Sequence, residues 1–203
     1  MQNKVAVFGD LTALFQIRKV IKANINYYQI DKAIKKHFNV EKFTTNKFYT
    51  LFVPENEGQV KFVAGLEKNL GWKIETKRPS EIRRIVDSDD HNGELNALSH
   101  RQYRFDAEIA YDLAEATAED EIDTVVVISD SIELLNPLKR CQTWIKNVNL
   151  AFFADTIDSR WWKNFGKDSA INFMDLRELM YKSINDDESN DVPEELSRFE
   201  NDD

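Results

Sequence analysis

Three aspartates stand where an α/β protein could carry out metal or phosphoryl chemistry. Asp10 ends the apolar stretch VAVFGD, and Asp130 ends a second apolar stretch, VVVISD. Asp106 opens a helical pattern that precedes the second stretch, where negative charge also suits a helix N-terminus for purely structural reasons. The carboxyl ends of parallel strands meet at one edge of a sheet, so we expect the three carboxylates to converge.

Converging carboxylates repel one another, and a divalent cation relieves that repulsion. Oxygen ligands without histidine or cysteine suit Mg²⁺ or Mn²⁺. Such an ion can activate water for attack on a phosphodiester. Aspartates at strand ends also serve sugar and nucleotide chemistry, so the spacing alone leaves these possibilities open.

The elements that must position these aspartates follow from the apolar pattern. It predicts strands at residues 4–8, 48–53, 72–76, 124–128, 149–153 and 170–173. It predicts helices within residues 14–38 (two, broken near 24–26), 60–70, 105–118, 132–148 and 175–183. Apolar strands that alternate with helices indicate an α/β fold, with a mostly parallel central sheet of five or six strands covered on both faces.

The first motif resembles a known family. The stretch VFGDLTALF is similar to the opening motif of the NYN domain, a PIN-like family of metal-dependent ribonucleases. Asp10 stands at the family's aspartate, and Ala13 stands where the family has asparagine. The resemblance runs over residues 4–180, which is nearly the whole of the predicted domain.

The later motifs resemble the same family. YRFDAEIAYDL supplies Asp106 and Asp112, with Tyr-Arg-Phe in place of the family's Lys-Gly-Val. VVVISDSIEL supplies Asp130 and Ser131, but Ile132 replaces a second aspartate. The closing strand and aspartate, INFMDL, fit the family pattern. The order and spacing of the motifs match together, although none is complete.

The resemblance implies a single three-layer PIN-like (NYN) domain over residues 1–183, followed by an acidic tail, residues 184–203, that we expect to be disordered. It implies a Mg²⁺- or Mn²⁺-dependent ribonuclease acting on single-stranded RNA. The residues expected to be catalytic and to hold the metal are Asp10, Asp106 and Asp130. The expected supporting residues are Asp112, Ser131 and Glu133, and the expected RNA-binding residues are Arg101, Arg104, Lys19 and Lys22.

Two other functions remain open from the sequence. Ala13 and Ile132 remove a polar partner and one carboxylate, which favours a catalytically impaired NYN-fold protein. Such a protein would bind RNA or another protein, with a homodimer as one form of interaction. The other alternative is a flavodoxin- or receiver-like signalling domain with an acidic pocket, although a convincing switch lysine is missing.

The charge is divided unevenly along the chain. The formal net charge is −9. Residues 186–203 hold nine acidic side chains and one basic side chain, whereas residues 1–47 hold nine basic and three acidic side chains. A basic region can bind phosphates, and an acidic tail could compete for it. Solvated surface explains the same pattern without any ligand.

Composition narrows the class of protein. No run of about 18 apolar residues is present, so we expect no transmembrane helix and no membrane partner. The chain enters a strand pattern at Lys4 without a basic and apolar leader, and its single cysteine, Cys141, cannot form an internal disulfide. We therefore expect a cytoplasmic protein.

Two further features are assigned structural roles. Residues 87–93 faintly resemble a calcium loop, but Ser99 stands where that loop requires glutamate, so a polar loop near the site is expected. Trp161 and Trp162 could stack on bases, but adjacent tryptophans more often divide between core and surface.

Overall fold

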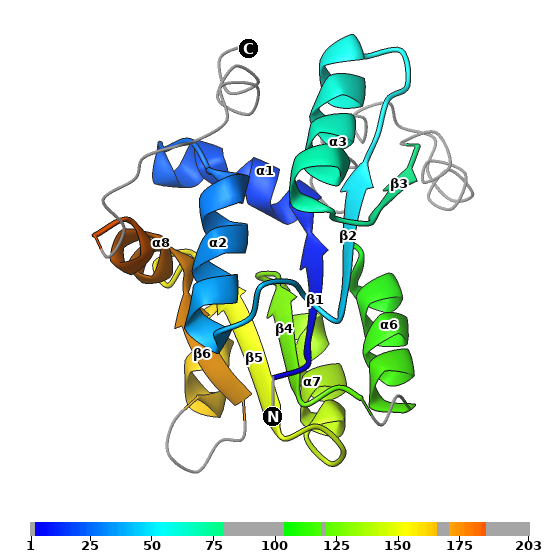
Figure 1. Ribbon diagram of the computed structural model, residues 1–203. Coiled ribbons are helices and arrows are strands. Elements are labelled where there is room, and N and C mark those ends of the chain that lie inside the picture. Colours follow the sequence, from blue (N-terminus) through cyan, green and yellow to red (C-terminus); the bar gives the residue numbers. More distant parts are fainter. Residues whose placement is uncertain (1–2, 79–103, 119–120, 166–170, 186–203) are drawn as a thin grey trace, which may run out of the picture.

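A computed structural model of the protein describes residues 3–78, 104–118, 121–165 and 171–185. The predicted polar loop at 87–95, Arg101 and the acidic tail beyond residue 185 lie outside the described residues. A six-stranded sheet forms the middle layer, and helices cover both of its faces (Figure 1). The predicted three-layer α/β fold is confirmed.

The strands are β1 (Val5–Asp10), β2 (Thr45–Leu51), β3 (Ile74–Lys77), β4 (Thr124–Ile128), β5 (Asn147–Phe152) and β6 (Ile171–Asp175). All five pairings are parallel, and the strand order is β3-β2-β1-β4-β5-β6. The order therefore reverses between β1 and β4. Open α/β sheets typically bind ligands beyond the carboxyl ends of the strands on either side of such a reversal.

The helices are α1 (Leu11–Ile21), α2 (Tyr27–Phe38), α3 (Glu57–Leu70), α6 (Asp106–Ala118), α7 (Leu135–Cys141) and α8 (Leu176–Asn185), with 3₁₀ turns η2 (Ile132–Leu134) and η3 (Ser159–Asn164). Side chains on the same strand alternate between two hydrophobic cores. Val5 and Val7 join the core shared with α1, α2, α3 and α8, whereas Ala6 and Phe8 join the core shared with α6 and α7. Burial on both faces explains why the strands read as continuous apolar runs.

The helix boundaries follow from the chemistry of their ends. Asp10, Asn26 and Asn56 cap the N-termini of α1, α2 and α3, each side chain accepting a hydrogen bond from a backbone N–H three residues later. Gly71 ends α3 with a φ of 65°, a left-handed conformation that glycine adopts without strain. The predicted break between two helices near residues 24–26 is confirmed.

One predicted element is wrong in extent. The pattern predicted a helix over most of residues 132–148, but the helical residues end at Cys141, and β5 begins at Asn147. The five residues of β4 span about 16 Å. The ten residues of η2 and α7 run back about 15–20 Å in the opposite direction, which brings the chain to the start of β5. A helix continued to residue 148 would overshoot the start of β5. Pro137 lies in the first turn of α7, where no N–H is needed.

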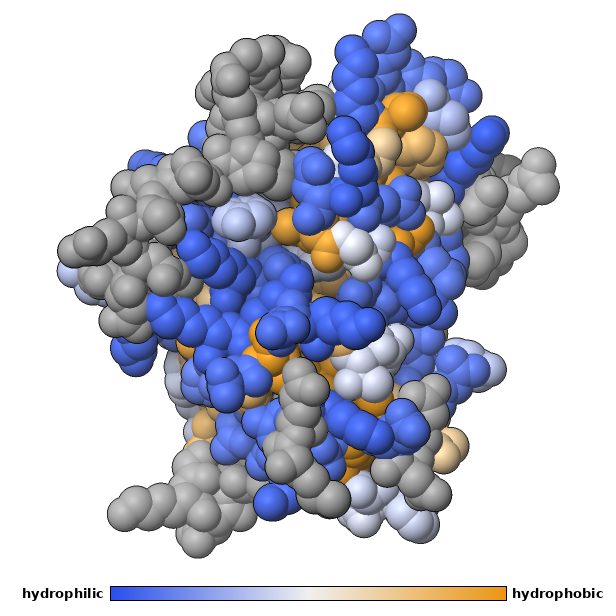
Figure 2. Space-filling view, in the orientation of Figure 1, coloured by the Kyte–Doolittle hydropathy of each residue, from blue (hydrophilic) through white to orange (hydrophobic). Residues whose placement is uncertain are grey.

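The surface on the side of α2 is mainly hydrophilic, and apolar atoms show near the upper end where α3 lies (Figure 2). Within the described residues, none of the helices combines the length and the apolar character that crossing a bilayer requires.

Candidate acidic centre

Asp10, Asp106 and Asp130, which we call the acidic centre, come from three elements that meet at the reversal in strand order. Asp10 is the last residue of β1, Asp130 follows β4 by two residues, and Asp106 is the first residue of α6. β1 pairs with β4 up to Gly9 and Ile128, so the two strands end side by side. The charge of Asp130 raises the pKa of both Asp10 and Asp106, so Asp130 lies close enough to each of them to interact electrostatically.

Asp10 is the most deeply buried of the three, with 1% of its surface exposed. One carboxylate oxygen accepts a hydrogen bond from the backbone N–H of Ala13 at 3.0 Å, and the backbone of Phe105 also bonds to the carboxylate. Burial nevertheless dominates and raises the pKa of Asp10 from 3.8 to about 7, with a further contribution from Asp130. This carboxylate is held in place without a full counter-charge.

Asp106 has one satisfied and one unsatisfied oxygen. The hydroxyl of Ser131 donates to Oδ2 at 2.8 Å, whereas Oδ1 is buried and has no hydrogen-bond partner among the residues that the structure describes. Burial raises the pKa of Asp106, and the charges of Asp130 and Glu133 add to that effect, while Ser131 and Arg104 oppose it. A buried carboxylate oxygen without a partner is costly unless a ligand supplies one.

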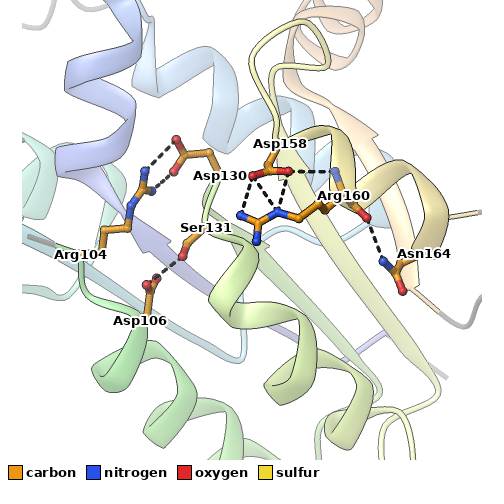
Figure 3. Close-up of polar contacts among 7 residues, drawn as sticks. All are labelled: Arg104, Asp106, Asp130, Ser131, Asp158, Arg160 and Asn164. Carbon is orange, nitrogen blue, oxygen red and sulfur yellow. Dashed lines mark hydrogen bonds and ion pairs between the residues drawn. The ribbon is translucent and has the colours of Figure 1, made fainter. Parts of the chain in front are cut away.

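Asp130 is paired with Arg104, the second residue before Asp106. The guanidinium donates to both carboxylate oxygens, through Nη1 to Oδ1 and through Nη2 to Oδ2 at 3.4 Å (Figure 3). Burial lowers the pKa of Arg104, but the bond to Asp130 and the charges of Asp130, Asp106 and Asp10 outweigh it and raise the pKa above its ordinary value. Arg104 therefore faces the whole acidic centre.

The donor set suits a magnesium or manganese ion in type, but its present arrangement does not enclose one. The candidate ligand atoms are carboxylate oxygens, and the buried Oδ1 of Asp106 is without a hydrogen-bond partner in the described part of the chain. Within the described ranges, no three acidic, histidine or cysteine side chains are grouped so that they could hold one ion. The guanidinium of Arg104 supplies positive charge at this place instead.

The remaining predicted site residues lie at different distances from the acidic centre. Glu133 is exposed in η2, and both Asp106 and Arg160 sense its charge. Lys22 is the C-cap of α1, twelve residues from Asp10, which at 1.5 Å per residue is roughly 18 Å away. Lys19 belongs to the last turn of the same helix. The structure thus brings Arg104 to the acidic centre but does not bring Lys22 there.

Asp112 belongs to a separate polar cluster with Lys47 and Tyr49. Its Oδ1 accepts from Lys47 Nζ at 3.0 Å, and its Oδ2 accepts from the Tyr49 hydroxyl. Asp112 and Tyr49 are each 3% exposed. The cluster ties α6 to β2, and Tyr49 pairs in register with Asp10. Asp112 therefore supports the acidic centre by positioning the helix that carries Asp106.

Replacing Asp112 with alanine is expected to destabilise the protein by about 2 kcal/mol, because it leaves the largely buried hydroxyl of Tyr49 without its acceptor and removes one of the two carboxylates that pair with Lys47, the other being Glu75. Urea unfolding would measure the change. Glu115→Ala is the matched control, since Glu115 is an exposed acid on the same helix. Equal effects of the two substitutions would contradict the supporting role of Asp112.

The sequence did not single out Lys47 and Tyr49, because their partner is more than 60 residues away. It also gave no role to the pair formed by Asp158 and Arg160, in which the Arg160 Nη2 lies 2.7 Å from Asp158 Oδ2 (Figure 3). The spacing Asp-Ser-Arg at the start of η3 was its only signal. Trp161 is fully buried and Trp162 is 46% exposed, so the two adjacent tryptophans divide between core and surface.

No model of a known protein family matches the chain, and no curated protein matches it either. Among solved structures, the chain is similar to a protein of unknown function from Vibrio parahaemolyticus, with a TM-score of 0.59 and 14% sequence identity. The similarity covers 86% of this chain and 94% of that protein. At this level of identity the likeness shows the fold, a single three-layer α/β domain with a parallel sheet.

Proposed function

We propose that the protein is a divalent-metal-dependent ribonuclease that hydrolyses phosphodiester bonds of single-stranded RNA. The observation that carries the proposal is that Asp10, Asp106 and Asp130 stand on elements that meet at the strand-order reversal of a parallel sheet, and that one buried oxygen of Asp106 has no hydrogen-bond partner among the described residues. The choice of RNA as substrate rests on the resemblance of the three aspartate motifs to the NYN family.

Asp10, Asp106 and Asp130 would hold Mg²⁺ or Mn²⁺. When bound, the ion would polarise the phosphodiester and lower the pKa of the attacking water. Asp10 is fixed by two backbone bonds, and Ser131 fixes the rotamer of Asp106 through its hydroxyl. Bonds of this kind orient metal ligands before the ion binds. The guanidinium of Arg104 would donate two parallel N–H hydrogen bonds to the two non-bridging oxygens of a phosphate.

The strand order is also that of dinucleotide-binding domains, but the local sequence argues against a bound dinucleotide. Those domains carry a glycine-rich turn after the first strand, where the pyrophosphate meets a helix N-terminus. Here the residues that follow Gly9 are Asp10, Leu11, Thr12 and Ala13. The Asp10 carboxylate already occupies the α1 N-terminus and would repel a pyrophosphate.

The second candidate is a catalytically impaired protein of the same fold that binds RNA or another protein. The pairing of Arg104 with Asp130 favours it, because the guanidinium uses the oxygens that an ion needs. Ala13 and Ile132, at family motif positions, favour it as well.

Cleavage of a labelled single-stranded RNA in Mn²⁺, Mg²⁺ or EDTA separates the two candidates. We expect cleavage with either metal and none in EDTA. Asp130→Asn should lower the rate by at least about 100-fold, since loss of even a ligand-supporting residue costs about 10- to 100-fold. Asp123→Asn is the matched control, because Asp123 is exposed at the opposite end of the same strand. Absence of cleavage by folded protein, across several RNAs and both metals, would leave the second candidate.

A further inference from the structure

Positive charge is concentrated on α1, α2 and the turns that flank them. Residues 11–42 hold seven basic and two acidic side chains. One of the two acids, Asp31, is 5% exposed and already binds Lys35, whose Nζ lies 2.7 Å from its Oδ2. By contrast, α3 holds two basic and two acidic side chains, and α6 holds four acidic side chains and no basic one. The basic charge therefore belongs to helices that cover one face of the sheet.

Lys32, Lys35 and Lys36, which we call the basic stripe, lie on one face of α2. Residues three and four positions apart are neighbours on a helix surface, and like charges placed in this way repel one another. The opposite face of α2 carries Ile30 and Ile34, which are buried in the core. The stripe is thus held on the outer side of α2, where an anionic partner would stabilise it.

The end of α8 lies close to the end of α2. The two helices pack against each other, and Leu179 and Met180 of α8 contact the core that α2 covers (Figure 1). Partial burial lowers the pKa of His37, in the last turn of α2, and the charge of Lys182, in the last turn of α8, lowers it further. The chain that follows α8 therefore starts beside the basic stripe.

The acidic tail has the charge that the basic stripe lacks. Residues 186–203 hold nine acidic side chains and one basic side chain, and Asp186, Asp187 and Glu188 follow α8 directly in the sequence. A flexible chain of this length has a root-mean-square span of about 24 Å, and the twelve residues of α2 cover about 18 Å. The tail is thus long enough to reach the whole stripe, and its attachment to α8 keeps its effective concentration in the millimolar range.

We propose that the acidic tail docks on the basic stripe of its own molecule. The contacts are ion pairs exposed to solvent, each of them weak, and the tether to α8 allows several to form together. Docking weakens as the salt concentration rises, because exposed charges are screened. The inference does not depend on the proposed function. It implies that any other polyanion reaches the α2 lysines only by displacing the tail.

The first test is cleavage of the full chain by a glutamate-specific protease, which cuts after Glu188, Glu194 and Glu195 in the tail. At low salt, the double variant Lys32→Gln/Lys36→Gln should lose its tail about 2- to 30-fold faster than wild type, the range expected for the loss of two exposed ion pairs. At about 1 M salt, where charges are screened beyond roughly 3 Å, the two proteins should be cleaved equally fast.

Lys139→Gln/Lys163→Gln is the matched control. It removes the same charge from α7 and η3, which contact the core on the other face of the sheet, and should leave the cleavage rate unchanged. Circular dichroism would check that each variant is folded. A cleavage rate that the α2 substitutions leave unchanged, or that the control variant raises equally, would overturn the docking.

Cross-linking of the wild-type chain by a carbodiimide keeps the test decisive if a variant does not fold. This reagent joins carboxylates to ammonium groups that contact them, and mass spectrometry identifies the linked peptides. We expect links from the tail to α2 to outnumber links from the tail to Lys139 at low salt, with the excess lost at high salt. Equal numbers of both links would mean a solvated tail and would overturn the proposal. Links that form only between two molecules would overturn it in favour of a second copy as the occupant of the stripe.

Discussion

Replacing Gly9 with alanine is expected to destabilise the protein by about 3 kcal/mol, the upper end of the usual cost of overpacking a core. A Cβ atom at this position would stand 2.6 Å from two ring atoms of Phe48, the residue opposite Gly9 on β2. The Phe48 ring is fully buried and stacks on Trp72 with 3.8 Å between ring centroids. Because the ring has no room to withdraw, β1 must shift, and Asp10 is the next residue along it.

Gly71→Ala is the control variant, because it replaces a glycine without creating a steric clash. At Gly71 an added Cβ meets no atom within 4 Å, and the only penalty is the left-handed backbone, which costs roughly 1–2 kcal/mol. Urea unfolding of both variants would measure the difference. Phe48→Ala should be less harmful in the Gly9→Ala background than alone, because it removes the ring that clashes. A Gly9→Ala variant no less stable than Gly71→Ala would show that the close packing of β1 on Phe48 is not required.

The sequence predicted the central strands well because their residues are buried on both faces and therefore lack polar alternation. Val125, Val126 and Val127 are fully buried, and they alternate between the two cores. The end of α3 was equally clear, since Gly71 marks it with a conformation that other residues avoid. The length of the helix within residues 132–148 was not predicted correctly. The length of a helix that runs back along a strand depends on the length of that strand, which the local pattern of the helix does not contain.

The acidic centre was predictable in its positions but not in its contacts. The strand-end rule placed Asp10 and Asp130 together, since it depends only on the order of elements. Nothing in the local pattern showed that Arg104 pairs with Asp130 rather than with solvent, because that contact joins residues 26 apart. The unpartnered oxygen of Asp106 likewise depends on how α6 packs against the chain after β4.

Replacing Asp10 with asparagine is expected to remove a pH dependence from the stability of the metal-free protein. The folded-state pKa of Asp10 is raised to about 7, whereas an unfolded aspartate titrates near 3.8. Between these values the folded state binds more protons, so the free energy of unfolding falls as pH rises and becomes level above pH 7. The full effect is about 4 kcal/mol, from about 3 pKa units at 1.36 kcal/mol each.

The measurement is the difference in unfolding free energy between Asp10→Asn and wild type at pH 4, 6 and 8. The asparagine oxygen can still accept from Ala13, so the variant keeps the α1 cap, and its advantage over wild type should grow as pH rises. Asp123→Asn reports the effect of the same substitution at an exposed position. Mn²⁺ should restore the stability of wild type at pH 8 but not that of the variant, because the ion supplies the charge that the buried carboxylate lacks. A difference that does not change with pH would mean that Asp10 is already ionised and neutralised by its present neighbours, and the centre would then have no need of a cation.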